Sequence, residues 1–218
     1  MSDRRDFIKK TAITGFGLGM AGSAAGLYKG MNTGKRIGMV GLDTGHSEAF
    51  TKSLNDPLAG DKFLGYKVTA AYPKGTENIK EWKDRIPEIT EKVESYGVEI
   101  VNSMEDLLKK VDVVLITCID GNRHLEQALP VFEAGKPVFI DKPFAGSLSD
   151  AYAIAKAAKK YNVPLFSSSS LRYINGAEEI AEGKIGPVIG AEAYSPAPVS
   201  YTHLRAHETV LVISYAVF

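Results

Sequence analysis

Short apolar runs alternate with segments of helical length through the middle of the chain, and this alternation constrains the fold more than any other feature. The runs are rich in β-branched residues, which is typical of strands buried on both faces. We expect strands at 36–41, 66–72, 99–101, 113–117, 137–140 and 163–166 and helices at 46–55, 80–96, 124–134 and 149–161, with a further helix capped by Ser103. Such alternation predicts right-handed βαβ units and an α/β fold with a doubly wound parallel sheet.

The length of the chain allows one complete domain and part of another, since domains average roughly 100–200 residues. We expect the parallel-sheet domain at 32–170 and the start of a truncated second α/β domain with an open sheet at 171–199. The first strand of that second domain is expected to begin at 189–194. The four serines at 167–170 are expected to form the turn between the two domains.

Residues 1–31 have the pattern of an export signal. Arg4 and Arg5 are followed by Phe7 and Lys9, and then by an uncharged segment at 11–28 that contains five glycines. This order resembles a twin-arginine signal, which predicts recognition by the twin-arginine export machinery and a periplasmic location. A stable membrane span is not expected, because glycine dilutes the apolar segment and its length barely crosses a bilayer core of about 30 Å. An ordinary secretory signal or an uncleaved anchor is the alternative.

Composition excludes several classes of protein. The 26 basic and 26 acidic side chains cancel, which argues against a nucleic acid as the main partner. The single cysteine excludes an internal disulfide and a cysteine-based zinc site. The 44% of apolar residues is ordinary for a globular domain, so an enzyme and a binding domain both remain open.

The last segment, 200–218, is expected to be a non-native tail. Its first ten residues resemble a translated sequencing adapter, so the native sequence is expected to end near Val199. His203 and His207 stand four residues apart, but Leu204 occupies the place where a zinc-protease helix needs glutamate. We therefore predict no metal site there or elsewhere in the chain.

In parallel sheets of this kind, ligands bind beyond the carboxyl ends of the strands, where the strand order reverses. The loop after the first strand lies where a glycine-rich dinucleotide fingerprint would. Its candidate cofactor-binding residues are Gly41, Asp43, Thr44, Gly45, His46 and Ser47. We expect backbone N–H groups at the helix start and the hydroxyls of Thr44 and Ser47 to bind phosphate. The Asp43 carboxylate is unfavourable near a pyrophosphate unless it turns toward another partner. A plain strand-to-helix turn explains the same residues equally well.

Two further loops supply candidates. After the second strand, Tyr72 and Lys74 stand where an acidic residue would bind the ribose hydroxyls of NAD, so Lys74 favours the 2′-phosphate of NADP. A solvated lysine is the alternative. The loop after the central strand contributes Thr117, Asp120, Asn122 and His124, of which His124 either contacts ligand or packs its helix. Cys118 is interpreted as a small buried residue rather than a nucleophile.

The fourth loop carries the most specific pattern. Glu133-Ala-Gly-Lys136 and Asp141-Lys-Pro143 follow His124, and Gly183-Lys-Ile-Gly-Pro187 comes later in the chain. In this order the segments resemble the Gfo/Idh/MocA family of oxidoreductases, which includes glucose–fructose oxidoreductase and inositol dehydrogenase. The resemblance spans residues 35–194 and implies a Rossmann-like domain that binds NAD or NADP.

The resemblance assigns a role firmly to one residue only. Lys142 matches the family lysine that lies beside the nicotinamide and the substrate hydroxyl, so it is the predicted catalytic residue. An ammonium group there polarises a hydroxyl or carbonyl while hydride leaves the carbon. Asp141 stands where the family has glutamate, and Ile119-Asp120-Gly121 replaces the family's Thr-Pro-Asn. A solvated lysine in a turn is the alternative for Lys142.

The expected function is hydride transfer between NAD or NADP and a sugar or polyol, with this fragment alone inactive. Two alternatives stay open: a glycoside hydrolase or lyase that oxidises its substrate transiently through bound NAD, and a non-catalytic sugar-binding relative. The complete protein is a candidate homo-oligomer, because the family's open sheet often forms the dimer contact.

Overall fold

The computed structural model of the chain describes residues 35–190, which divide after Ser169 into two units. The predicted export signal at 1–31 and the predicted tail at 200–218 lie outside the described residues. So do residues 191–194 of the strand expected in the second domain.

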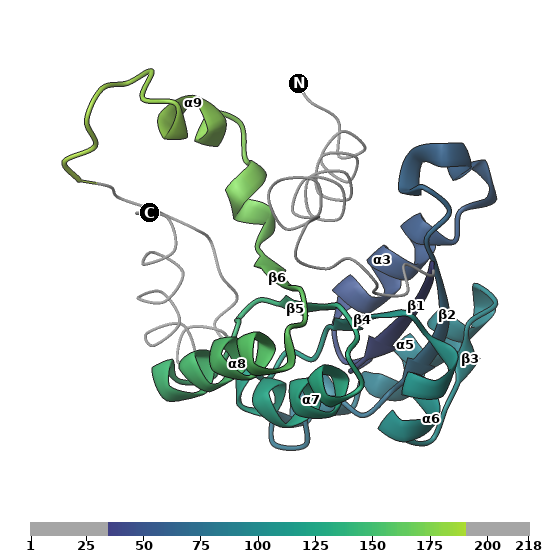
Figure 1. The fold of residues 1–218 in the computed structure, drawn as a ribbon. Helices are drawn as coiled ribbons and strands as arrows, with labels where there is room; N and C mark the ends of the chain where they lie inside the picture. The colour runs from purple at the N-terminus through teal and green to yellow at the C-terminus, as the bar shows by residue number, and fades with distance from the viewer. Residues whose placement is uncertain (1–34, 191–218) are drawn as a thin grey trace. The chain divides into compact units, whose positions relative to one another are not determined.

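The first unit is built on one sheet in which all the strands are parallel (Figure 1). Its strands are β1 (Arg36–Val40), β2 (Lys67–Tyr72), β3 (Glu99–Ile100), β4 (Val113–Ile116), β5 (Val138–Asp141) and β6 (Leu165–Ser168). They lie in the order β3-β2-β1-β4-β5-β6. The predicted doubly wound parallel sheet is therefore confirmed.

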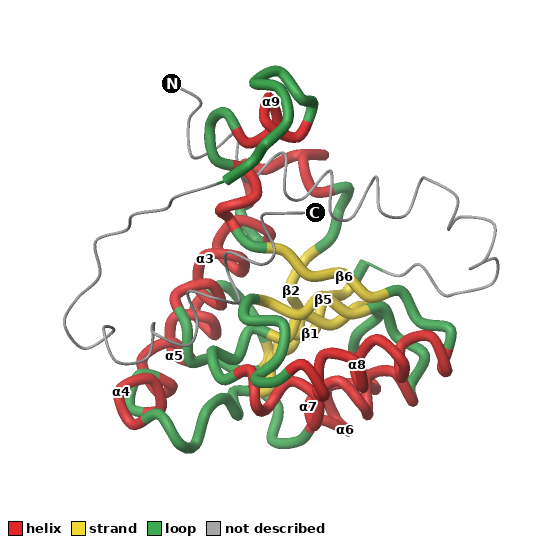
Figure 2. The backbone as a smooth tube through the Cα atoms, turned by 90° about the vertical axis from the view of Figure 1, so that its left-hand side faces the viewer, coloured by secondary structure: helices red, strands yellow, loops and turns green. Residues whose placement is uncertain are grey.

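Helices cover both faces of this sheet (Figure 2). On one face lie α3 (Gly45–Leu54) and α5 (Ile86–Ser95), and on the other lie α6 (Met104–Lys110), α7 (Gly121–Glu133) and α8 (Leu148–Tyr161). The short helices η2 (Pro57–Phe63) and α4 (Lys80–Lys83) stand within the connections. In β4, Leu115 packs in the core on the α3–α5 side, while Val114 and Ile116 pack in the core on the α7–α8 side. This two-residue alternation of fully apolar side chains buries the strand on both faces.

Most long helices begin at a side chain that caps them. Thr44, Ser103 and Ser147 accept a backbone N–H at the starts of α3, α6 and α8, and Asp120 does the same for α7. The Ser103 cap was predicted from the sequence. The predicted start of α7 at His124 was wrong, because the Asp120 carboxylate accepts the Asn122 N–H at 3.0 Å and starts the helix at Gly121.

An ion pair joins β1 to the residue before β4 at the amino ends of the strands, which we call the amino edge of the sheet. The Asp112 carboxylate accepts from the backbone N–H, Nε and Nη2 of Arg36 at 3.0, 2.9 and 2.9 Å. This guanidinium lowers the pKa of Asp112 below its usual range. The fork geometry ties the starts of two central strands together.

The second unit, described by itself over 170–190, contains η3 (Ser170–Tyr173) and α9 (Ala177–Ala181). The serines predicted to form a turn divide differently, because Ser167 and Ser168 pair with β5 as the end of β6. Ile189 and Gly190 carry no regular secondary structure. Across residues 35–190, no helix combines the length and the apolar character that crossing a bilayer requires.

Candidate functional site

The candidate site lies at the carboxyl ends of the strands, where the loops after β1, β2, β4 and β5 meet. Strand β1 pairs with β2 on one side and with β4 on the other, so the chain crosses to opposite sides of the sheet around it. Loops that diverge at this point leave room for a ligand. All of the cofactor-binding residues predicted from the sequence stand in or beside these loops.

The first loop turns sharply at Gly41. This residue has a φ of +82°, and a side chain there would approach the backbone of Cys118 to 2.7 Å. The Gly41 carbonyl accepts from the hydroxyls of Ser47 and Thr117 at 3.0 and 2.8 Å, and all three residues are buried. Thr44 donates its hydroxyl to the Thr117 carbonyl. The hydroxyls of Ser47 and Thr44 therefore already donate their hydrogens to backbone carbonyls and have none free for the predicted contacts with phosphate. Backbone N–H groups are left for that role.

The Asp43 carboxylate has its partners in the loops after β2 and β4. Its carboxylate accepts from the backbone N–H groups of Thr76 and Ile119 at 2.7 and 3.0 Å, and from the Cys118 thiol at 3.4 Å. One buried side chain therefore ties together the loops after β1, β2 and β4. Burial raises the pKa of Asp43, and the hydrogen bonds from Thr76, Cys118 and Ile119 offset part of that rise.

Burial also raises the pKa of the Cys118 thiol, and the neighbouring Asp43 carboxylate raises it further. A thiol in this state is a poor nucleophile. This supports the interpretation of Cys118 as a buried structural residue.

The start of α3 is open toward solvent. A side chain built on Gly45 would meet nothing within 4 Å, and the Gly45 N–H makes no hydrogen bond within the described residues. Next to it, His46 has a ring that is 39% exposed, and its Nδ1 lies 2.5 Å from Oδ2 of Asp141. An unpaired N–H at a helix start beside a partly exposed imidazole is suited to an anion.

Asp141 connects this helix start to the predicted catalytic residue. It is the last residue of β5, and its carboxylate accepts from His46 through one oxygen and from the Lys142 backbone N–H, at 2.8 Å, through the other. The Lys142 side chain is exposed, and its ammonium forms no hydrogen bond or ion pair in the described part of the chain. The loops after β1 and β5 are therefore joined, and the lysine side chain is left available.

The residues predicted after β4 have structural partners. Asp120 caps α7 and accepts from the Asn122 side chain at 2.9 Å and from the Thr76 hydroxyl at 3.4 Å. His124 lies inside α7, fully buried, with its ring nitrogens 2.8 Å from the Cys118 carbonyl and 3.2 Å from the Phe144 carbonyl. The packing alternative predicted for His124 describes this position, because both ring nitrogens lie within hydrogen-bond distance of backbone carbonyls. Cofactor contact by Asp120, Asn122 and His124 stays a prediction.

A pocket of about 170 Å³ lies between the end of β2 and the helices α6 and α7. Tyr72 and Lys74, both predicted from the sequence, line it together with Arg123 and Gln127 of α7. Glu77 stands 3.3 Å from the Lys74 ammonium and 3.8 Å from Arg123. Sequence reasoning missed Glu77, Arg123 and Gln127. The signal that could have found Glu77 is present in the sequence. It is an acidic residue three positions after Lys74, just beyond the turn where such a residue was sought.

Within the described residues, no group of three or more His, Cys, Asp or Glu side chains is arranged to hold a metal ion. The polar donors at these strand ends are instead backbone N–H groups, two ammonium groups (Lys74 and Lys142), one guanidinium and one amide. Such donors suit an anionic organic molecule that carries several oxygen acceptors.

Comparison with known proteins bears on the identity of this site. Residues 35–169 match the family model described as the oxidoreductase family with an NAD-binding Rossmann fold, GFO_IDH_MocA. The chain is 30% identical over 182 residues to a myo-inositol 2-dehydrogenase of Thermotoga maritima, which covers 78% of this chain and 48% of the relative. It is 37% identical over 101 residues to a 1,5-anhydro-D-fructose reductase of Ensifer adhaerens, covering 43% of this chain and 30% of the relative.

Among solved structures, the WlbA dehydrogenase of Bordetella pertussis in complex with NADH and UDP-GlcNAcA has the same fold, with a TM-score of 0.54 and 21% identity. The match covers 69% of this chain and 42% of that protein. The chain spans less than half the length of the curated relatives named here. The glycine turn at Gly41, the parallel sheet and the match over residues 35–169 lead to one conclusion: the chain belongs to the Gfo/Idh/MocA oxidoreductase family and carries its NAD-binding Rossmann domain.

Proposed function

We propose that this chain is the cofactor-binding part of an oxidoreductase that transfers hydride between NAD or NADP and a carbon of a sugar or polyol. The family supports the reaction type. The names of two relatives, a myo-inositol 2-dehydrogenase and a 1,5-anhydro-D-fructose reductase, support a polyhydroxylated substrate. The observation that carries the proposal is the free Lys142 ammonium at the end of β5.

The residues present fit a nicotinamide dinucleotide. The tight turn at Gly41 and the open space at Gly45 leave the start of α3 accessible, and the unpaired Gly45 N–H is available to a pyrophosphate oxygen. The Arg123 Nε and the Gln127 Oε1 are buried without a hydrogen-bond partner in the described residues, and both residues line the pocket at β2. Buried polar atoms without partners are unfavourable unless a ligand pairs with them.

In this proposal, the bound cofactor supplies the hydride acceptor or donor, and Lys142 acts on the substrate oxygen. Its ammonium donates a hydrogen bond to the hydroxyl or carbonyl and stabilises the negative charge that develops on oxygen during transfer. Asp141 orients the turn, because its carboxylate holds both the Lys142 backbone N–H and the His46 ring. The lysine side chain itself is left free for substrate.

Replacing Lys142 with alanine tests the proposal, in the full-length protein. Loss of one charged donor to a developing oxyanion should lower turnover about a hundred- to a thousandfold. Affinity for NAD⁺ should stay within about threefold, since the groups expected to bind phosphate lie at α3. Turnover is followed by NADH absorbance with myo-inositol and other polyols, and cofactor affinity by calorimetry.

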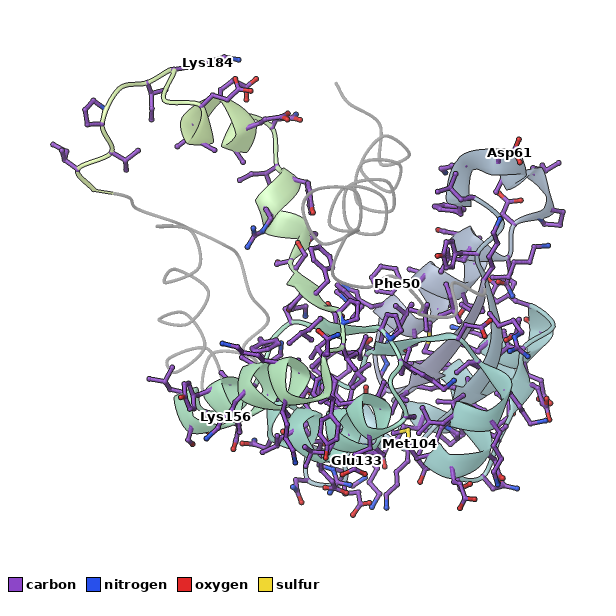
Figure 3. All side chains as sticks on the ribbon, viewed as in Figure 1. Phe50, Asp61, Met104, Glu133, Lys156 and Lys184 are labelled. Atoms are coloured by element: carbon purple, nitrogen blue, oxygen red, sulfur yellow. The ribbon has the colours of Figure 1, made fainter. Side chains whose placement is uncertain are left out.

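Lys156→Ala is the matched control, because Lys156 lies on the exposed side of α8 (Figure 3). Equal turnover in the Lys142 and Lys156 variants would show that Lys142 only forms part of a turn. Absence of NAD⁺ and NADP⁺ binding in the unmodified protein would remove the oxidoreductase proposal altogether and favour a non-catalytic relative.

A further inference from the structure

The side chain of His46 reaches from the start of α3 to the end of β5. Its Nδ1 lies 2.5 Å from Oδ2 of Asp141, a residue 95 positions further along the chain. Strand β4 stands between β1 and β5 in the sheet, so this contact joins two loops whose strands are not neighbours. The imidazole therefore sets the distance between the loop after β1 and the loop after β5.

Two aromatic contacts hold the His46 ring in this orientation. The ring lies 5.7 Å from that of Phe50, one turn further along α3, and Phe50 makes a T-shaped contact with Phe139 of β5 at 6.2 Å. Phe139 stands two residues before Asp141 in the same strand. Aromatic rings at these distances attract one another and restrict one another's rotation. The imidazole thus approaches Asp141 from a position that packing defines.

The Asp141 carboxylate has one protein donor for each of its oxygens. Oδ2 meets the His46 ring, and Oδ1 accepts the Lys142 backbone N–H at 2.8 Å. The Asp141 side chain is only 4% exposed, so water is a poor substitute for either donor. Removing a donor from a buried carboxylate leaves that oxygen unpaired or forces the group to turn, and both outcomes are unfavourable. Loss of the His46 contact would therefore release the group that holds the Lys142 N–H.

We propose that His46 is a positioning residue for hydride transfer, which acts on the substrate only through Asp141 and Lys142. The imidazole fixes the carboxylate, the carboxylate holds the Lys142 N–H, and the turn directs the ammonium toward the substrate oxygen. The inference rests on the proposed function of Lys142 and deepens it. It also gives the His46 ring a role other than phosphate contact, which is left to the unpaired Gly45 N–H beside it.

One test measures hydrogen exchange at the Lys142 amide by NMR, in the chain without cofactor. His46→Phe keeps an aromatic ring against Phe50 and removes the donor to Asp141, so we expect exchange at Lys142 to accelerate about tenfold. His46→Asn places an amide nitrogen where Nδ1 stands, so the exchange rate should stay within about twofold of wild type. Equal protection of the Lys142 amide in wild type and both variants would overturn the inference.

A second test asks whether His46 acts through Lys142, by turnover of the full-length protein at saturating cofactor and substrate. His46→Phe should lower kcat about tenfold in the wild-type background and less than about twofold in Lys142→Ala, because residues that act as a unit are not additive. His46→Asn should keep most of the wild-type turnover. Loss of NAD⁺ affinity with unchanged kcat would make His46 a cofactor contact and overturn the positioning role. So would a loss of kcat that persists undiminished in Lys142→Ala.

Glu48→Gln is the matched control for both tests. Glu48 stands in the same first turn of α3, and its carboxylate pairs with Lys92 of α5 at 3.4 Å, away from Asp141. The variant should change neither the exchange rate of the Lys142 amide nor kcat.

The lysine variant separates this inference from the proposed function. Unchanged turnover in Lys142→Ala would refute the proposed function and this inference with it. A large loss in Lys142→Ala, together with wild-type exchange and turnover in His46→Phe, would refute the positioning role alone and leave the oxidoreductase proposal standing.

Discussion

The sheet has one buried aspartate at the amino ends of its strands (the amino edge) and one at their carboxyl ends (the carboxyl edge). The two carboxylates are stabilised in opposite ways. At the amino edge, Asp112 accepts its hydrogen bonds from the charged Arg36, and its pKa is lowered. At the carboxyl edge, Asp43 accepts only from backbone N–H groups and a thiol, and its pKa is raised. The amino edge is thus built for stability. The carboxyl edge accepts an unfavourable charge in order to hold three loops together around the candidate site.

The largest expected effect comes from breaking the carboxyl edge at Gly41. Gly41→Ala combines a φ of +82° with a side chain 2.7 Å from the Cys118 backbone, so we expect a loss of about 3 kcal/mol in the free energy of unfolding. Gly45→Ala is the control, since its side chain meets nothing, and stability should be unchanged or rise by up to about 1 kcal/mol. Urea denaturation measures both. Equal stability of the two variants would mean that the turn tolerates a side chain.

A smaller effect is expected at the amino edge from Asp112→Asn. Loss of the charged partner of Arg36 should destabilise the chain by about 1–2 kcal/mol at neutral pH. Because the folded pKa is lowered, this stabilisation is complete above the unfolded value of about 3.9 and is lost as pH falls through the folded pKa. Asp61→Asn, at an exposed position of the short helix η2 (Figure 3), is the control. A pH-independent difference between wild type and Asp112→Asn would contradict this account.

The smallest effect is expected from Asp43→Asn, about 1 kcal/mol or less, because the amide keeps one acceptor and removes a buried charge. The sign of its pH dependence is opposite to that of Asp112. The folded state binds the proton more tightly than the unfolded state, so wild-type stability falls as pH rises from about 3.9 through the raised folded pKa. The advantage of wild type over the variant should shrink across that range in parallel urea titrations. An advantage that grows with pH would show that Asp43 is stabilised by charge after all.

The spacing of apolar residues predicted the strands and helices, and with them the sheet, because this spacing is a local property of the sequence. Val113 to Ile116 is apolar at every position, and a strand buried on both faces needs that pattern. Boundaries were predicted less well where one side chain decides them. The Asp120 cap starts α7 three residues before the predicted start, and pairing with β5 draws Ser167 and Ser168 into a strand.

The position of the candidate site could be predicted from the sequence, but the partners of its side chains could not. The rule for strand ends located Asp43, Lys74 and Lys142 correctly at the carboxyl edge. Partners distant in sequence were not predictable. Asp43 and Ile119 are 76 residues apart, as are the hydrogen-bonded residues Arg36 and Asp112. Glu77 and Arg123 meet only because β1 brings the loops after β2 and β4 together.

The central place of β1 also bears on how the chain folds during synthesis. Strand β1 pairs with β4 through Ile37 and Val113, so its second neighbour leaves the ribosome long after the strand itself. Until then one edge of β1, whose last four residues are buried in the folded chain, stays without its partner. Nascent chains of this topology expose an unpaired strand to chaperones and to other chains for as long as translation of the intervening segment takes. Slower translation of residues 41–112 would lengthen that exposure without changing the final structure.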